Sequence, residues 1–391
     1  MTDAIDQLFV HLKHWLLGFV PDEWRMLASI ILSVLPVFIV FPGLFALVTV
    51  IERKALGRIQ NRYGPNRVGP FGFLQFAADG LKTLTKEDIV PRNADKVVHF
   101  LAPLTLVLPA FLVYAVLPFG RGMTMLDLDC GLLFFFAVGA TTEMSVFMAG
   151  WASRNKYSLF GAMRAIAQMI SYEIPLILSA ITVVMISGTL SLTKMVEAQG
   201  TFFGLLPDWY VFTPWGLTGF ILFLICAAAE SNRSPFDLPE GESEIIAGYY
   251  IEYSGFKFAL FFLGEYLALF AVCSLGITLF LGGWNAPATW LQFIPSYGWY
   301  IIKLLALIMF FIWIRGTLPR LRQDQLMNFA WKFMIPMALV NLLAAACWHY
   351  ATPGFSRWFV SGAIVLGTYW MLGKGLLAGR QVVKRVYRFA D

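Results

Sequence analysis

Residues 257–283 decide the class of fold, and they read KFALFFLGEYLALFAVCSLGITLFLGG. This stretch is long enough to cross about 30 Å of hydrocarbon as a helix, and it contains a single carboxylate, Glu265. The sequence therefore predicts an all-α polytopic membrane bundle of about nine transmembrane helices. The predicted spans are residues 27–51, 97–118, 131–152, 162–189, 214–230, 257–283, 299–318, 330–350 and 357–378.

The composition agrees with a membrane protein. The chain has 391 residues, of which 59% are hydrophobic and 14% are charged, and its mean hydropathy is +0.69. Soluble domains carry about 25% charged residues, so a soluble enzyme is excluded, and a net charge of +5 does not favour nucleic acid as a partner. We expect a single transmembrane domain over residues 1–378, with an eight-span core at 27–350, an additional span at 357–378 and a basic cytoplasmic tail at 379–391.

Basic residues divide unevenly between the loops. When the loops between the spans are numbered in alternation, one set contains only six of the 29 Lys and Arg residues. By the positive-inside rule, the other, basic set faces the cytoplasm. We therefore expect a protein of the bacterial inner membrane, or alternatively of the mitochondrial one, with a periplasmic N-terminus and a cytoplasmic C-terminus. The six residues are Lys13, Arg25, Arg121, Lys194, Lys303 and Arg357.

Cysteine and histidine do not form the patterns that bind metals or clusters. The cysteines at positions 130, 226, 273 and 347 are far apart, and none forms a C-x-x-C pair. No histidine lies in the middle of a span with a partner, where a pair of haem ligands would be needed. We expect this chain to bind no metal or haem itself.

Two segments on the basic side differ from ordinary loops. Residues 70–86 place apolar and polar side chains on neighbouring helical stripes, which is typical of an amphipathic helix at the membrane interface; a plain connecting helix is the alternative. Six acidic residues lie between positions 229 and 253. Acidic residues contribute little to topology, so these charges indicate a hydrated cavity or a docking surface, and a solvated loop is the alternative.

Three further carboxylates, Glu143, Glu173 and Glu265, lie within the predicted spans. An ionisable group at such depth costs at least about 2.5–3.5 kcal/mol. At the rise of an α-helix, all three fall about halfway across the membrane, in one layer, and Glu230 lies between this layer and the acidic loop. Because a like-charged set in a low dielectric cannot be wholly ionised, the layer favours a proton relay; neutral acids hydrogen-bonded within the bundle are the alternative.

Several strings resemble a known family. They are Glu52-Arg53-Lys54, QNRYGPNRVGP at 60–70, GAMRA at 161–165 with Gln168 and Ser171-Tyr172-Glu173, the loop at 232–244, IEYSG at 251–255, and Trp313-Ile314-Arg315 through Pro319-Arg320 to Asp324-Gln325. These strings resemble the family of the quinone-chamber membrane subunit, the H-type subunit, of the proton-pumping NADH:quinone oxidoreductase, which is respiratory complex I. The resemblance runs from about residue 45 to residue 350.

The resemblance implies a function within a large assembly. Members of this family help to form the chamber that quinone enters from the bilayer, and they couple quinone reduction to proton translocation. Quinone is then the substrate, FMN and iron–sulfur clusters are held by partner subunits, and this chain is not catalytic alone. The implied partners are the peripheral-arm quinone-module subunits, adjacent antiporter-like membrane subunits and membrane lipids.

The resemblance also assigns residues to two groups. The residues implied for the quinone chamber are Glu52, Arg53, Arg62, Asp79, Arg233, Phe261 and Tyr266. Those implied for the proton relay are Glu173, Glu230, Asp237, Glu240, Glu242, Glu244, Glu252 and Glu265. Glu143 departs from the family pattern, so its place in the relay is predicted from its depth alone. The ninth span extends the eight-span core, and we expect it either to pack against a neighbouring subunit or to lengthen the anchor.

Three other functions are alternatives. The corresponding subunit of a membrane-bound hydrogenase, formate hydrogenlyase or ferredoxin- or F420-linked dehydrogenase would use a different donor, although residues 61–70 resemble the quinone-using branch better. A stand-alone proton-coupled transporter usually has internal repeats, and the two halves of this sequence show no repeat. A passive anchor would use the acidic loop only to bind a basic partner.

Overall fold

The structure is a computed structural model, and it describes residues 6–203, 206–237, 248–351 and 354–378. Its α-helices are α2 (Leu8–Leu17), α3 (Arg25–Ile59), α4 (Gln75–Thr85), α5 (Lys96–Leu112), α6 (Gly131–Gly139), α7 (Thr141–Ala152), α8 (Lys156–Ser187), α9 (Leu192–Ala198), α10 (Pro214–Glu230), α12 (Gly255–Phe280), α13 (Ser296–Thr317), α14 (Gln323–Phe329), α15 (Ile335–Tyr350) and α16 (Phe355–Ala378). The short helices are η1 (Asp22–Trp24), η2 (Pro70–Gly72), η3 (Val113–Val116), η4 (Tyr210–Phe212), η5 (Gly248–Tyr250), η6 (Thr289–Leu291) and the π-helical turn η7 (Ala330–Met334). Two-residue strands β1 (Phe202–Phe203) and β2 (Leu206–Pro207) pair antiparallel.

Each predicted span falls on a helix or on consecutive helices. In the described residues, seven helical segments are long and apolar enough to cross a membrane. Helix α10 is shorter, with 17 residues, and α16, with 24 residues, is not among the seven. The predicted all-α class is confirmed, and the chain is a multi-pass membrane protein. Several boundaries differ: α3 continues past the predicted end at 51 to Ile59, and α8 begins at Lys156 rather than at 162.

Local signals in the sequence set several helix ends. The side chains of Asp95, Asn155 and Thr213 accept hydrogen bonds from the first-turn N–H groups of α5, α8 and α10, as N-cap residues do. Pro214 begins α10, where its missing N–H costs nothing. Gly188 ends α8 in the left-handed conformation, with φ of 68°, which glycine adopts without strain.

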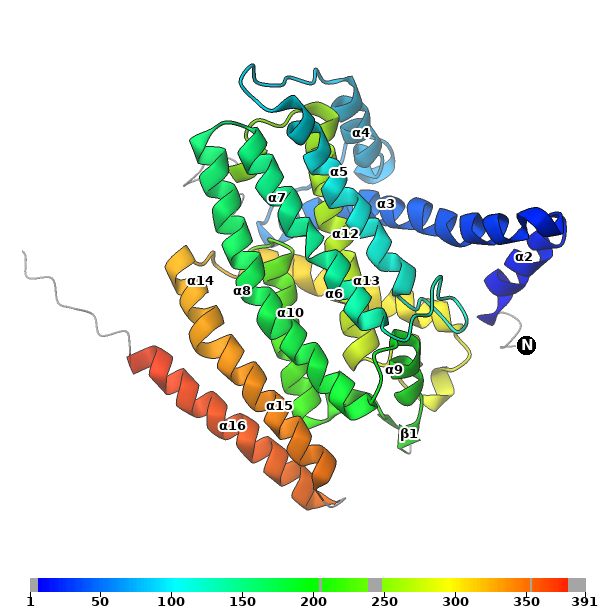
Figure 1. Cartoon of the computed structure of the whole chain (residues 1–391), viewed down its shortest axis with the longest axis vertical. Coiled ribbons are helices and arrows are strands. Elements are labelled where there is room, and N and C mark those ends of the chain that lie inside the picture. Colours follow the sequence, from blue (N-terminus) through cyan, green and yellow to red (C-terminus); the bar gives the residue numbers. More distant parts are fainter. Residues whose placement is uncertain (1–5, 204–205, 238–247, 352–353, 379–391) are drawn as a thin grey trace, which may run out of the picture.

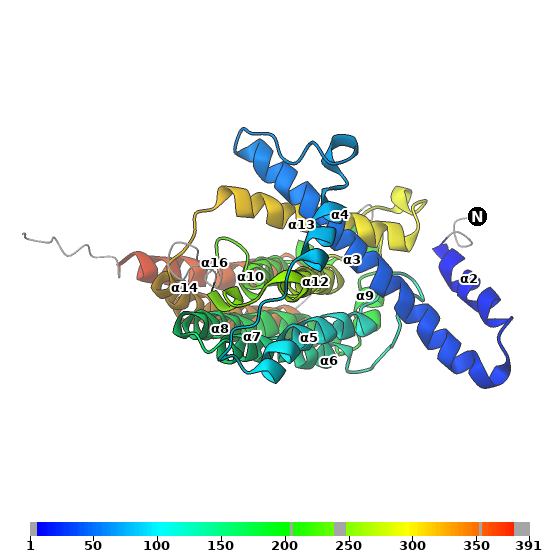
Figure 2. The same ribbon diagram turned by 90° about the horizontal axis from the view of Figure 1, so that it is seen from above.

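The long helices form one bundle. Helix α8 packs against α7, α10 and α15, and α5 packs against α7 and α12; these helices run alongside one another in Figure 1. Helix α3 crosses the bundle obliquely on one side (Figures 1 and 2). Helix α4 lies at one end, and α9 with the β-strands lies at the opposite end. Helix α16 runs along α15 on the outside of the bundle.

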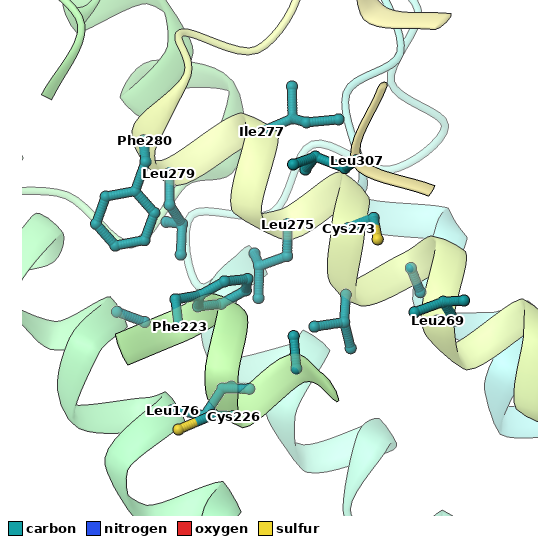
Figure 3. Close-up of a cluster of buried hydrophobic side chains, with 14 of the residues drawn as sticks. Leu176, Phe223, Cys226, Leu269, Cys273, Leu275, Ile277, Leu279, Phe280 and Leu307 are labelled. Atoms are coloured by element: carbon teal, nitrogen blue, oxygen red, sulfur yellow. The ribbon is translucent and has the colours of Figure 1, made fainter. Parts of the chain in front are cut away.

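The centre of the core is the second half of α12. Every residue from Tyr266 to Phe280 is buried except Ala268, which is the pattern of a helix surrounded by other helices. Figure 3 shows side chains of this half of α12 beside Phe223 of α10 and Leu307 of α13. Because the second half of α12 is fixed by this packing, Glu265 and Tyr266 are held at the edge of an apolar core.

Candidate functional site

Glu52 is the most deeply buried of the predicted acidic residues that the structure describes, with 3% of its surface exposed. One carboxylate oxygen accepts a hydrogen bond from Arg233 at 2.8 Å and another from Arg315. The second oxygen accepts from the Tyr266 hydroxyl at 2.6 Å. Arg233 also lies over the Tyr266 ring, 4.0 Å from the guanidinium carbon to the ring centroid. Helices α3, α12 and α13 and the loop after α10 therefore meet at one carboxylate.

This cluster carries an excess of positive charge, because two guanidinium groups face one carboxylate. Burial works against the charge of Arg233, but contact with Tyr266 and Glu52 holds the pKa of Arg233 above its usual range. Arg315 was missed as a site residue. It lies in one of the family strings, but 263 positions separate it from Glu52, and no sequence signal indicated that the two side chains would meet.

The other residues predicted for the quinone chamber lie outside the Glu52 cluster. Arg53 forms an ion pair with Asp79 at 2.5 Å and so joins the end of α3 to α4. Both side chains are substantially exposed. Arg62 is exposed and donates a hydrogen bond to the side chain of Gln60. Phe261 belongs to a separate apolar cluster, where its ring packs edge-on against tyrosine side chains.

Two of the three carboxyl groups predicted to share a layer are in direct contact. Glu143 of α7 and Glu173 of α8 are joined by a side-chain hydrogen bond, and both are half-buried. A carboxylate is only an acceptor, so one member of the pair must carry a proton. Glu230 lies close enough to interact electrostatically with both. The layer predicted from helical rise therefore corresponds to real proximity for Glu143 and Glu173, with Glu230 beside them.

Glu265 lines a small cavity together with Glu230. The cavity has a volume of about 40 Å³, well above the roughly 10–15 Å³ that one water requires. Glu230, Glu265 and Asn232 supply polar groups to its wall. The Tyr249 hydroxyl donates to Glu265 at 3.0 Å, and the Tyr250 hydroxyl donates to the same oxygen. One oxygen of Glu230 is buried and has no hydrogen-bond partner among the described residues, and the carboxyl group of Glu230 is one of the few polar groups on a mostly apolar cavity wall.

The first part of the acidic loop is tied to α8 by Gln168. The Gln168 amide nitrogen donates to the backbone carbonyls of Ala229 and Phe236, both at 2.7 Å. Asp237 follows directly, and its backbone carbonyl accepts from Arg320. The sequence pointed to Gln168 only as part of a motif, and this anchoring role was not predicted.

The remaining loop acids do not join the cavity in the described part of the chain. The carboxylate of Glu252 accepts a hydrogen bond from Asn155 at 2.8 Å, at the start of α8. Glu240, Glu242 and Glu244 lie outside the described residues. Within the described ranges, no three His, Cys, Asp or Glu residues are grouped so as to hold a metal ion.

The fold and these clusters define a multi-pass membrane protein that gathers acids and arginines inside its helix bundle. A family model described as NADH dehydrogenase matches residues 32–346. The chain belongs to the NADH dehydrogenase family, as the sequence motifs predicted. Helix α16 begins beyond the matched residues.

Curated relatives are similar over most of their length. The chain is 52% identical over 296 residues to the H-type subunit of the NADH-quinone oxidoreductase of Dehalococcoides mccartyi, a match that covers 76% of this chain and 80% of the relative. It is 51% identical to the same subunit of Bacillus cytotoxicus over 296 residues, a match that covers 75% of this chain and 86% of the relative. It is 46% identical to the same subunit of Brevibacillus brevis over 323 residues, a match that covers 83% of this chain and 92% of the relative. These relatives are all bacterial.

Proposed function

We propose that this chain is a membrane subunit of an NADH:quinone oxidoreductase, that it helps to form the quinone-binding chamber, and that it couples quinone reduction to proton translocation. The names of its relatives support the first part. One geometric observation carries the rest. Ser231 and Asn232 line the cavity beside Glu230 and Glu265, and the next residue, Arg233, binds Glu52.

In this proposal the chain works only within the assembly. The basic loops face the cytoplasm of a bacterium, where peripheral-arm subunits hold the FMN and the iron–sulfur clusters, and the N-terminus faces the periplasm. Antiporter-like subunits adjoin the membrane face. Quinone enters from the bilayer near α3 and α4, where Arg53 and Asp79 are paired.

Arg233 is the proposed link between the chamber and the acids. Reduction of quinone adds negative charge and consumes protons, and the excess positive charge around Glu52 responds to that change because both guanidinium groups are held close to it. Movement of Arg233 would carry Asn232 and Ser231 with it, since they adjoin in the chain. Those two residues line the cavity wall, so a charge change in the chamber reaches the cavity through three consecutive residues.

The acids are the proposed proton carriers. Glu143 and Glu173 hold one proton between them, and Glu230 is within electrostatic reach of that pair and also lines the cavity with Glu265. Tyr249 and Tyr250 keep Glu265 oriented. A proton can pass along such a row by exchange between neighbouring carboxyl groups and cavity water. Asp237, Glu240, Glu242, Glu244 and Glu252 would extend this row toward the cytoplasmic loop.

The test is replacement of the carriers in the assembled complex. Glu173→Gln and Glu265→Gln keep the shape of the side chain but cannot exchange a proton at neutral pH, so we expect loss of NADH-driven proton pumping and of coupled quinone reduction. Asp129→Asn is the control, because Asp129 is exposed beside Lys194. Normal pumping in both glutamine variants would contradict the proposed relay and would indicate that the chain is a passive anchor.

A further inference from the structure

The end of the bundle opposite α4 is closed by two buried polar side chains that the proposed proton path does not use. Gln199, which is 0% exposed, follows α9. Its amide nitrogen donates to the carbonyls of Thr278 at 3.0 Å and Leu279 at 3.3 Å, in the last turn of α12. Its amide oxygen accepts from the N–H of Gly282 at 3.1 Å. Gln199 thus satisfies backbone groups that a helix end leaves without partners.

Lys303 of α13 binds further carbonyls at the same end of the bundle with its charged side chain. Its ammonium group donates to the carbonyls of Leu281, Gly283 and Asn285, at 2.7, 2.8 and 2.7 Å. Three donors are available only in the protonated form, so the side chain is held as a cation. It is 9% exposed and lies 4.0 Å from the centroid of the Trp209 ring. A buried positive charge therefore occupies the negative end of the α12 dipole.

Apolar packing separates this charge from the acids of the cavity. From Leu269 to Phe280 the side chains of α12 are buried, and Figure 3 shows several of them beside α10 and α13. The hydroxyls of Ser274 and Thr278 donate back to carbonyls of their own helix, at 2.7 and 2.8 Å. Both hydroxyls thereby satisfy the backbone of α12. This half of the bundle is therefore packed mainly with apolar side chains.

We propose that Lys303 is a proton barrier, which keeps the carboxyl groups around the cavity from exchanging protons with the opposite face of the membrane through this subunit. The proposal rests on the proposed function for the direction of proton flow. A relay that opened to both faces would dissipate the gradient it helps to create. The five carbonyls at the end of α12 and its turn would attract a hydrated proton, and Lys303 occupies three of them with a charge that repels one.

The position of Lys303 agrees with this role. In the proposed topology it lies in α13 near the periplasmic face, on the side that carries only six basic residues. Trp209, which follows β2 by two positions, covers the ammonium with its ring. A cation at this place is costly to bury, and its three hydrogen bonds hold it there.

The test compares Lys303→Gln with Lys303→Arg in the assembled complex in inverted membrane vesicles. Glutamine keeps two N–H donors for the carbonyls but removes the charge, whereas arginine keeps both. We expect Lys303→Gln to raise passive proton leak after an acid pulse at least roughly tenfold, because a unit charge a few ångströms away changes the energy of a proton by more than a factor of ten requires. The NADH-driven pH gradient should fall while NADH:quinone reductase activity is unchanged. Lys303→Arg and the exposed control Lys374→Gln should match the wild type.

A normal leak rate in assembled Lys303→Gln would overturn the barrier. Should that variant not assemble, Lys303→Met is a second uncharged side chain of similar length and should also leak, and a tight Lys303→Met complex would count against the barrier. The double variant Lys303→Gln with Glu265→Gln separates this inference from the proposed function. A leak that persists in the double variant does not pass through the cavity acids and contradicts the proposal, whereas normal pumping in Glu265→Gln alone contradicts only the proton relay.

Discussion

The carboxyl groups of Glu143 and Glu173 share a hydrogen bond across the interface between α7 and α8. One carboxyl must be protonated for this contact to form, so the pair carries at most one negative charge while the bond is intact. Two ionised carboxylates at this separation would repel each other and would also lack water around them. The structure thus makes Glu143 the partner of Glu173, a contact that its depth in the sequence alone did not specify.

Glu143→Gln should weaken proton pumping more than quinone reduction. Glutamine can still donate to Glu173, so the packing of α7 on α8 is kept, but the shared proton is replaced by an amide hydrogen that does not exchange as an acid. We expect loss of one protonated-carboxyl band in the infrared spectrum and a lower proton-to-electron ratio. Glu197→Gln, at an exposed site on α9, serves as the control. An unchanged band and an unchanged ratio would mean that Glu143 is only a packing residue.

Glu52→Gln should destabilise the chain strongly. The substitution leaves Arg233 and Arg315 without their shared counter-ion, and removing one partner of a buried ion pair costs about 3–5 kcal/mol. The matched control is Asp79→Asn, since the Arg53–Asp79 pair is substantially exposed and such pairs contribute about 0–1 kcal/mol. Thermal unfolding of the purified protein in detergent should show a clear loss of stability for Glu52→Gln and almost none for Asp79→Asn. Equal melting temperatures would contradict this account of the cluster.

Gly161→Ala should displace the two tyrosines that hold Glu265. A Cβ at position 161 would lie 2.7 Å from the Cα of Gly248, at the start of η5, where Tyr249 and Tyr250 follow. The clash is with backbone, so η5 must move away from α8 at a cost of about 1–3 kcal/mol. We expect lower thermal stability together with impaired coupled quinone reduction.

The matched control for that change is Gly362→Ala in α16, where nothing lies within 4 Å of the added carbon. This variant should retain wild-type stability and activity. If Gly161→Ala behaved in the same way, the close approach of α8 and η5 would not be needed to orient Glu265.

Gln168→Leu should loosen the start of the acidic loop. It leaves the buried carbonyls of Ala229 and Phe236 without their donor, and each unsatisfied group costs about 1–3 kcal/mol. Hydrogen–deuterium exchange at residues 231–237 should accelerate, while exchange in α12 stays slow. Leucine at the exposed position Gln292 should not alter exchange in this loop. Unchanged protection in Gln168→Leu would show that Arg320 and the neighbouring backbone are sufficient anchors.

The helix pattern was predictable because hydropathy is a local property of the chain. The spans were placed from the lengths of the apolar stretches, and the helix at Gln75–Thr85 from its amphipathic period. The end of α3 was misplaced because the apolar run stops at Glu52, whereas the helix continues. The charge of Glu52 is tolerated inside the helix because Arg233 and Arg315 pair with it. Both arginines come from distant parts of the chain, so the local sequence did not indicate this pairing.

By itself, the sequence determined that this protein crosses the membrane many times, which family it belongs to, and which carboxylates lie within its apolar stretches. Tertiary structure alone decided the partners: Arg315 for Glu52, Glu143 for Glu173, and Tyr249 for Glu265. The physical reason is that burial depth follows from distance along one helix, whereas contact depends on which faces of separate helices pack together. The chemistry of this bundle resides in those contacts.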